Sequence, residues 1–228
     1  MAIRRVVPAI LTNDAHDLER MVRQAEQFTS WVQFDIMDGL FVPPQSVFST
    51  EIAAVRPGFE FDVHLMVRHP ESYFSGFQLA GARRLTIHFE AAVHPEAWTA
   101  YVRSRGLEAG LALNPETLWQ EITPGLTNAL DMVLLLSVDP GYYGRPFIPA
   151  VLEKAKALRR EYPDLILGMD GGIKEDNILD VARAGVDEIC VGSAIFREPD
   201  PAAAYRRVLA LAEQGWQEFA EKGSLPLS

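Results

Sequence analysis

Short apolar runs alternate with longer amphipathic segments along almost the whole chain. The runs consist of consecutive or alternating apolar residues bounded by turn-forming residues, which indicates β-strands. The expected strands are Val6–Leu11, Trp31–Met37, Phe61–Val67, Leu85–Phe89, Ala109–Leu113, Met132–Val138, Leu165–Met169 and Glu188–Val191. The sixth is the most continuously apolar, as expected for a parallel strand that is covered on both faces.

The segments between the strands carry apolar residues at helical spacing, the first of them Leu18, Met21, Val22, Ala25 and Phe28. Further helices are expected from a cap at Ser49 or Thr50 to Arg56, and over Pro70–Ala80, Pro95–Arg105, Leu118–Ile122, Pro149–Tyr162, Lys174–Ala184 and Pro201–Leu211. Eight strand-then-helix units with short connections predict an α/β fold, a single (β/α)8 TIM barrel over residues 1–228. We expect the C-terminal tail, from about residue 218 to 228, to be loosely ordered.

The strand Trp31–Met37 carries an acid where most strands carry apolar residues. With the two-residue period of a strand, Gln33, Asp35 and Met37 lie on one face and three bulky apolar residues lie on the other. A buried carboxylate is costly unless something pairs with it or coordinates it. The carboxyl ends of the strands are also where a parallel α/β barrel places its chemistry, so Asp35 is a candidate site residue.

Two further strands place chemically active residues at the same end of the barrel. His64 shares the inner face of its strand with Asp62 and Met66, and Asp170 directly follows the seventh strand. Two carboxylates and an imidazole, Asp35, Asp170 and His64, suit a divalent metal such as Zn²⁺, Mn²⁺ or Fe²⁺. A single aspartate at a strand end is often only a helix cap, and a single histidine is often a hydrogen-bonded core residue. Three of them at equivalent strand ends favour a site.

Glycine clusters follow the last three strands. They are Gly141-Tyr142-Tyr143-Gly144 after the sixth strand, Gly171-Gly172 after the seventh and Gly192-Ser193 after the eighth. Glycine lets backbone N–H groups converge on an anion, and the late loops of such barrels are a recurrent phosphate site. Each cluster could by itself be turn chemistry. Two of them at adjacent strand ends favour phosphate binding.

Composition narrows the function classes. The net charge of −10 and the pI of about 5.0 provide no basic field for nucleic acid or an anionic membrane, so we expect neither partner. The lone Cys190 cannot form an internal disulfide, and Met1–Asn13 lacks the features of a signal peptide. No apolar run approaches the roughly 18 residues of a membrane span. We therefore expect a cytoplasmic protein.

His88 lies at a strand position whose side chain faces the carboxyl-end opening of the barrel. A packing or supporting role for it is at least as well motivated as a catalytic one.

Seven motifs, in order along nearly the whole chain, resemble those of the ribulose-phosphate 3-epimerase family. They are Phe34-Asp35-Ile36-Met37-Asp38-Gly39-Leu40-Phe41-Val42-Pro43, Asp62-Val63-His64-Leu65-Met66, His88-Phe89-Glu90-Ala91, Leu113-Asn114-Pro115-Glu116-Thr117, Val138-Asp139-Pro140-Gly141, Asp170-Gly171-Gly172-Ile173 and Gly192-Ser193-Ala194-Ile195-Phe196. Each motif is weak alone, but the ordered combination is specific.

The resemblance implies a metal-dependent barrel enzyme of carbohydrate metabolism, in the pentose phosphate pathway, that inverts carbon 3 of a ketopentose 5-phosphate. It implies that Asp35 and Asp170 bind the metal and act as acid and base, and that His64 is a ligand. The metal would be Zn, Mn, Fe, Co or Mg. Phosphate would lie on the three glycine clusters, with Met37 and Met66 lining the site near the reacting carbons. The resemblance also implies that the protein forms a homo-oligomer.

The sequence departs from the family at the substrate site. Gln33 replaces a metal-binding histidine, and an amide oxygen is a poorer, neutral ligand. Ala9 replaces a serine that contacts substrate, and Leu136 replaces a methionine. In the phosphate loop Tyr143 replaces a glycine and Arg145 a glutamine.

These departures leave more than one function open. The first is a 3-epimerase acting on D-ribulose 5-phosphate or a related ketose phosphate through an enediolate. The alternative is a sugar-phosphate-binding homologue with weak or no activity, because of Gln33 and Ala9. Aldol addition or decarboxylation on the same scaffold is a distant option, since such barrels usually carry an Asp-x-Lys-x-x-Asp array that this sequence lacks.

Overall fold

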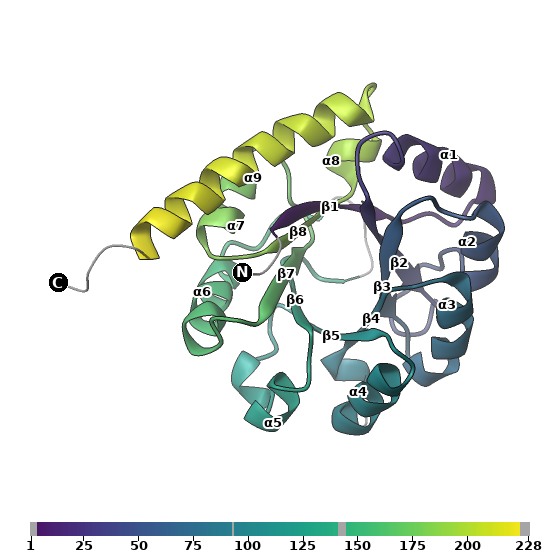
Figure 1. Cartoon of the computed structure of the whole chain (residues 1–228), viewed down its shortest axis with the longest axis horizontal. Coiled ribbons are helices and arrows are strands. Elements are labelled where there is room, and N and C mark those ends of the chain that lie inside the picture. Colours follow the sequence, from purple (N-terminus) through teal and green to yellow (C-terminus); the bar gives the residue numbers. More distant parts are fainter. Residues whose placement is uncertain (1–3, 93, 141–144, 224–228) are drawn as a thin grey trace.

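Eight parallel strands close into a barrel in chain order, with β1 paired to β8 (Figure 1). The computed structural model describes residues 4–92, 94–140 and 145–223. The strands are β1 (Arg5–Ile10), β2 (Trp31–Met37), β3 (Glu60–Met66), β4 (Arg84–His88), β5 (Glu108–Leu113), β6 (Met132–Leu136), β7 (Ile166–Asp170) and β8 (Glu188–Val191). The predicted (β/α)8 TIM barrel is therefore confirmed, and each expected strand agrees with an observed one to within two residues at either end.

Helices surround the outer face of the barrel (Figure 1). The α-helices are α1 (Ala15–Ala25), α2 (Ser49–Val55), α3 (Phe74–Ala80), α4 (Pro95–Ser104), α5 (Pro124–Thr127), α6 (Val151–Glu161), α7 (Ile178–Arg183), α8 (Ser193–Phe196) and α9 (Pro201–Gly223). Three short 3₁₀ turns accompany them: η1 (Pro70–Ser72), η2 (Phe89–Ala91) and η3 (Trp119–Glu121). Within the described part of the chain, every helix is too short or too polar to cross a bilayer.

Helix boundaries differ from expectation where local capping decides them. The segment expected as one helix over Pro70–Ala80 is a 3₁₀ turn followed by α3, and the helix expected over Leu118–Ile122 is only the turn η3. Helix α5 follows η3 and was not expected from the sequence. It begins there because the Thr123 hydroxyl accepts the Leu126 N–H and so caps the helix. The expected cap of α2 at Ser49 or Thr50 is replaced by Phe48, whose N–H donates to Glu51.

The C-terminal helix is the largest difference. Helix α9 runs to Gly223 rather than ending at Leu211, so the described part of the tail expected to be loose, residues 218–223, is helical. The helix packs against α1, α7, α8 and β1 (Figure 1). The Trp216 indole is buried and donates to the Val186 carbonyl at 2.7 Å, so tertiary packing extends the helix beyond the range that its sequence pattern indicates.

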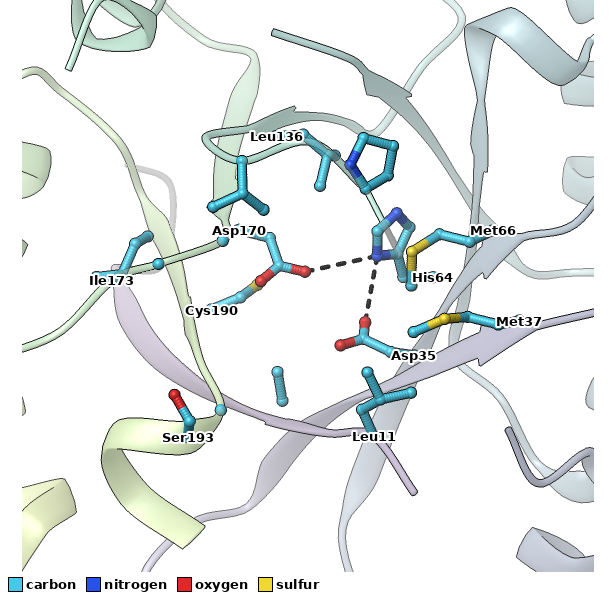
Figure 2. Close-up of a pocket in the computed structure, with 16 residues that line it drawn as sticks. Leu11, Asp35, Met37, His64, Met66, Leu136, Asp170, Ile173, Cys190 and Ser193 are labelled. Carbon is cyan, nitrogen blue, oxygen red and sulfur yellow. Dashed lines mark hydrogen bonds and ion pairs between the residues drawn. The ribbon is translucent and has the colours of Figure 1, made fainter. Parts of the chain in front are cut away.

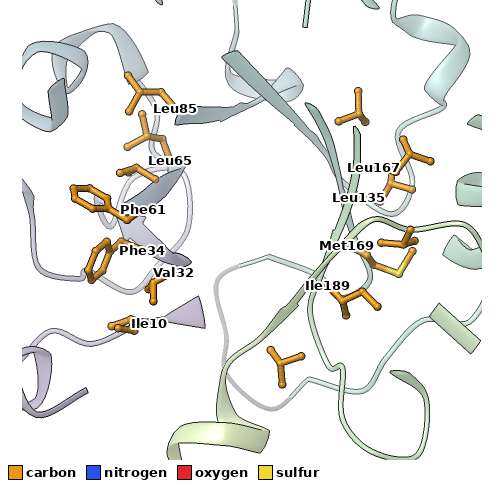
Figure 3. Close-up of a cluster of buried hydrophobic side chains, with 14 of the residues drawn as sticks. Ile10, Val32, Phe34, Phe61, Leu65, Leu85, Leu135, Leu167, Met169 and Ile189 are labelled. Carbon is orange, nitrogen blue, oxygen red and sulfur yellow. The ribbon is translucent and has the colours of Figure 1, made fainter. Parts of the chain in front are cut away.

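Apolar side chains fill two layers. The larger lies between the barrel and its helices, where the outward residues of each strand gather; Figure 3 shows Val32 and Phe34 on one side and Leu135 and Ile189 on the other. The second fills the barrel interior with Val7, Ala9, Trp31, Ala112, Met132, Leu134, Leu136 and Cys190. Because strand residues alternate between these layers, the inward polar residues of β2, β3 and β4 meet inside the barrel.

A buried ionic layer closes the amino-terminal end of the barrel. Arg84 is 0% exposed and donates to Asp62 at 2.9 Å and to Glu188, which also pairs with Arg5. Burial raises the pKa of Asp62 although the Arg84 charge opposes it. Burial also acts to raise the pKa of Glu188, but the charges of Arg84 and Arg5 outweigh it and lower that pKa. This layer supports the floor of the site, since Asp62 pairs in register with Gln33.

Candidate active site and metal centre

Three strands bring Asp35, His64 and Asp170 together at the carboxyl end of the barrel (Figure 2). Asp35 and His64 are partners in the register of β2 and β3, and Asp170 ends β7. The His64 Nδ1 lies 3.2 Å from Asp35 Oδ1 and 3.5 Å from Asp170 Oδ2. One ligand atom of each residue lies within 4.8 Å of the other two. The alternation of β2 and β3 predicted this meeting point; the roles of the three residues stay a prediction.

Gln33 lies beneath the two carboxylates and joins them. Its Nε2 donates to Asp35 Oδ1 and to Asp170 Oδ2, both at 2.8 Å. Its Oε1 faces away and accepts from the Cys190 thiol at 3.1 Å. Burial raises the pKa of that thiol, which keeps it protonated and able to donate. The amide therefore presents nitrogen to the candidate metal position, which differs from the expectation of an oxygen ligand at Gln33.

Asp35, His64 and Asp170 influence one another's charge because they lie in contact. Burial, followed by the charge of Asp170, raises the pKa of Asp35 to about 6, while hydrogen bonds from His64 and Gln33 act in the opposite direction. Burial disfavours the charged form of His64, but its hydrogen bonds and charge pairing with Asp170 and Asp35 outweigh this and raise its pKa to about 9. In the metal-free protein at neutral pH, His64 is therefore an imidazolium that offsets the two acids.

A second buried imidazole, His88 at the end of β4, contacts His64. His64 Nε2 lies 3.0 Å from His88 Nε2, and His88 Nδ1 lies 3.2 Å from Glu90 Oε2. Glu90 also accepts hydrogen bonds from the Asn114 backbone N–H at 2.9 Å and from the Thr117 hydroxyl. The sequence left the role of His88 open and did not indicate Glu90. The available signal was that Thr86, His88 and Glu90 follow one another at the two-residue spacing of a strand.

A pocket opens above the cluster (Figure 2). Its walls include the predicted site residues Ala9, Met37, Met66, Gly171, Gly172, Gly192 and Ser193. Met37 and Met66 give the pocket an apolar side and pack with Val42 in a small buried cluster. Gly171 and Gly172 have φ values of 114° and 66°, which side chains rarely adopt. Gly141, Tyr142, Tyr143 and Gly144, also predicted to hold phosphate, lie outside the described residues.

Ser137 holds the loop after β7 in place, a role that the sequence did not indicate. Its hydroxyl lies 3.0 Å from the Asp170 carbonyl and 2.7 Å from the Gly171 carbonyl. The loop is further confined at Gly172, where an added Cβ would lie 2.8 Å from the Phe147 backbone nitrogen. The backbone that joins the acid of β7 to the glycine wall is thus well determined.

The donor set fits a divalent cation. Two carboxylates and one imidazole nitrogen converge, and such hard and borderline donors match Zn²⁺, Mn²⁺, Fe²⁺, Co²⁺ or Mg²⁺. The His64 Nδ1 is the converging imidazole atom. A cation would also relieve the repulsion between Asp35 and Asp170. Without a cation, the Gln33 amide nitrogen reduces this repulsion by donating to both acids.

Sequence comparison identifies relatives over most of the chain. The family model "Ribulose-phosphate 3 epimerase family" matches residues 5–196. "Ribulose-phosphate 3-epimerase 2" of Cupriavidus necator is 37% identical, and the match covers 90% of this chain and 89% of that protein. "Ribulose-phosphate 3-epimerase" of Bacillus subtilis is 35% identical over 86% of this chain and 94% of that protein.

Solved structures support the fold at lower identity. A 3-hexulose-6-phosphate synthase from Salmonella typhimurium matches with a TM-score of 0.70 at 18% identity, over 94% of this chain and 100% of that one. KGPDC from Streptococcus mutans, in complex with D-R5P, matches with a TM-score of 0.73 at 13% identity, over 92% of this chain and 98% of that one. At these identities the matches show the barrel alone. Sequence identity and the matching family model decide the classification: the chain belongs to the ribulose-phosphate 3-epimerase family, a family of carbohydrate isomerases, as its motifs predicted.

Proposed function

We propose that this protein is a metal-dependent 3-epimerase of D-ribulose 5-phosphate or a related ketose phosphate, with Asp35 and Asp170 as its acid–base pair. One observation carries the proposal: acids from two well-separated strands, β2 and β7, meet over a single amide nitrogen at 2.8 Å each. Both line the floor of one pocket, whose wall carries Gly171, Gly172 and Ser193. This arrangement supports the proposal, because two acids that could carry a proton lie beside a surface suited to a phosphate.

Inversion at carbon 3 requires two such groups. One carboxylate removes the weakly acidic proton next to the ketone and leaves an enediolate, and the other returns a proton to the opposite face. One of the pair must therefore begin protonated. In the metal-free site, burial and the neighbouring charge of Asp170 raise the pKa of Asp35 to about 6, a shift in the direction that favours its protonated form.

The remaining groups position and protect the reacting carbons. Met37 and Met66 line the pocket with apolar surface that would exclude water from the enediolate, and they pack with Val42. A divalent cation held by Asp35, His64 and Asp170 would supply Lewis-acid stabilisation of the negative charge that develops on the substrate oxygens. The backbone of Gly171, Gly172 and Gly192, with the Ser193 hydroxyl, would bind the phosphate.

Isotope exchange tests the proposal. Protein loaded separately with Zn²⁺, Mn²⁺, Fe²⁺, Co²⁺ or Mg²⁺ is incubated with D-ribulose 5-phosphate in D₂O, and deuterium at carbon 3 is followed by NMR. Asp35→Asn and Asp170→Asn should each abolish exchange. Asp176→Asn, the same change at an exposed aspartate paired with Lys174, should leave it intact. A wild-type protein that exchanges no deuterium with pentulose or hexulose phosphates under any of these metals would refute the proposal.

A second candidate is a binding homologue that holds a phosphorylated sugar with little turnover. Ala9 lines the pocket without a hydroxyl, and Gln33 directs its amide nitrogen toward the acids. Tight binding of the sugar phosphate in calorimetry without deuterium exchange would favour this candidate. Combining Gln33→His with Ala9→Ser should then raise exchange sharply, whereas rapid exchange by the wild type would exclude it.

Self-association and location are part of the same proposal. The family resemblance supports a homo-oligomer, and Leu40, close to the mouth of the barrel, is 60% exposed. Light scattering coupled to size-exclusion chromatography decides between a single copy and an oligomer. We also infer a cytoplasmic enzyme, consistent with the lone, buried Cys190, and cell fractionation tests it.

A further inference from the structure

The hydrogen-bond series from Glu90 through His88 to His64 has a direction. We propose that Glu90 and His88 are positioning residues that keep a proton on His64 Nε2, so that Nδ1, the nitrogen that faces Asp35 and Asp170, is the one that gives up its proton to a metal. This inference rests on the proposed function, because it concerns the imidazole expected to bind the metal. It extends that function to two residues that are not among those lining the pocket.

The donor and acceptor of each hydrogen bond can be assigned starting from Glu90, because the groups that donate to it are unambiguous. One carboxylate oxygen, Oε1, accepts the Asn114 backbone N–H at 2.9 Å and the Thr117 hydroxyl. A backbone N–H can only donate, so this end of Glu90 must accept. Burial acts to raise the pKa of Glu90, yet the hydrogen bonds from His88, Thr117 and Asn114 lower it to about 2. The other oxygen of this carboxylate anion therefore also accepts, and the His88 Nδ1 at 3.2 Å carries a proton.

The proton on His88 Nδ1 determines the next contact. A neutral imidazole with one nitrogen protonated offers only a lone pair on the other, so His88 Nε2 accepts from His64 Nε2. The two ring centroids are 5.0 Å apart while the two Nε2 atoms are 3.0 Å apart, so the rings meet through their nitrogen edges. Their planes differ by 22°, which aligns the lone pair with the donor. His64 thus keeps its Nε2 proton, and only Nδ1 is available to a metal.

A lysine anchors the loop that holds Glu90. Lys154 on α6 donates from Nζ to three carbonyls of the loop after β5: Asn114 at 2.9 Å, Pro115 at 2.8 Å and Thr117 at 2.6 Å. Two of these residues are the ones that hydrogen-bond Glu90. The position of the carboxylate is therefore determined by α6 and the loop after β5, and not by the mobile end of an isolated side chain.

The substitution Glu90→Gln should reverse the series. An amide has one accepting oxygen and one donating NH₂, and the fixed Asn114 N–H requires the oxygen at its end. The NH₂ then faces His88 Nδ1, which must become an acceptor, so the His88 proton moves to Nε2. Two protonated Nε2 atoms cannot share a 3.0 Å contact, so His64 loses its Nε2 proton and keeps its remaining proton on Nδ1, whereas the wild-type imidazolium can release the Nδ1 proton to a metal and stay protonated on Nε2. A protonated Nδ1 cannot bind a metal.

The experiment reads the tautomers and the metal affinity directly. Long-range ¹H–¹⁵N NMR of histidine-labelled protein, with and without Zn²⁺, reports which ring nitrogen of His64 and His88 is protonated. Competition with a chelating dye measures the Zn²⁺ dissociation constant. We expect His88 protonated on Nδ1 in the wild type and on Nε2 in Glu90→Gln, with Zn²⁺ binding weakened about 10- to 100-fold. Glu116→Gln makes the same chemical change at an exposed neighbour and should alter neither measurement.

Each outcome decides the inference. A wild-type His88 protonated on Nε2 overturns it, and this measurement needs no variant to fold. A folded Glu90→Gln protein with unchanged tautomers and Zn²⁺ affinity also overturns it. These readouts need no substrate, so their success in a protein that shows no deuterium exchange would refute the proposed function and leave the positioning role in place. A wild-type protein that exchanges deuterium but has His88 protonated on Nε2 would support the proposed function and refute the positioning role.

Discussion

Removing Arg84 should destabilise the barrel far more than removing its neighbour Arg83. Arg84→Met keeps most of the side-chain length but deletes a guanidinium that is 0% exposed. Asp62, which is 1% exposed, then loses its hydrogen bonds from Arg84 at 2.9 and 3.3 Å. Glu188 also loses a donor, although Arg5 continues to pair with it. The main consequence is one buried carboxylate without a compensating charge.

The size of the effect follows from that burial. Breaking one side of a buried ion pair typically costs about 3–5 kcal/mol, because the remaining charge stays desolvated. We expect the free energy of unfolding of Arg84→Met to fall by about this amount. Arg83, which is 53% exposed and pairs with Glu108 at 3.1 Å, provides the matched control. Arg83→Met should cost below about 1 kcal/mol, since water screens that pair.

Urea denaturation followed by circular dichroism measures both variants, at pH 5 and pH 8. Without Arg84 the pKa of Asp62, already raised by burial, rises further. A carboxyl group with a folded pKa above its unfolded value loses stability as pH rises between the two values, so the deficit of Arg84→Met should be smaller at pH 5. Adding Asp62→Asn should recover part of the loss at pH 8. Equal costs for Arg83→Met and Arg84→Met would refute the reasoning.

Three further predictions concern the site itself. Gln33→Met removes both amide donors and should raise the pKa of Asp35 above about 6, measured by ¹³C NMR of the carboxyl carbon; an unchanged or lower pKa would contradict the geometry. Gly172→Ala combines a φ of 66° with a Cβ 2.8 Å from the Phe147 nitrogen. If strain of about 1–3 kcal/mol displaces this backbone from the phosphate, KM for a phosphorylated substrate should rise roughly 5- to 150-fold, and an unaltered KM would argue against a phosphate there. In metal-free protein, His64 stabilises the fold fully below its ordinary pKa of 6.5 and loses this contribution as pH rises through about 9. His64→Asn should therefore destabilise most near pH 6 and least near pH 10, and denaturation at both values checks it.

The structure differs from the sequence-based expectations mainly in where helices begin and end and in which groups hydrogen-bond to each other. Strand alternation alone placed Asp35 and His64 on the inner face, because the two-residue period is a property of the extended backbone. The starts of α2 and α5 depend on local capping: two cap candidates, Ser49 and Thr50, were weighed for α2, and α5 was not expected at all. Gln33 was expected to present oxygen to a metal, but the nearest acceptors and donors decide the orientation of an amide.

The sequence by itself determined the barrel, the inward faces of its strands and the convergence of two acids and an imidazole at one end. These follow from local periodicity, and each strand contributes its part independently. Only the tertiary structure decided what contacts what: Cys190 with Gln33, His88 with Glu90, and Lys154 with the loop after β5. Such contacts join residues that are distant in the chain or that could point elsewhere, and their direction depends on which partner can donate.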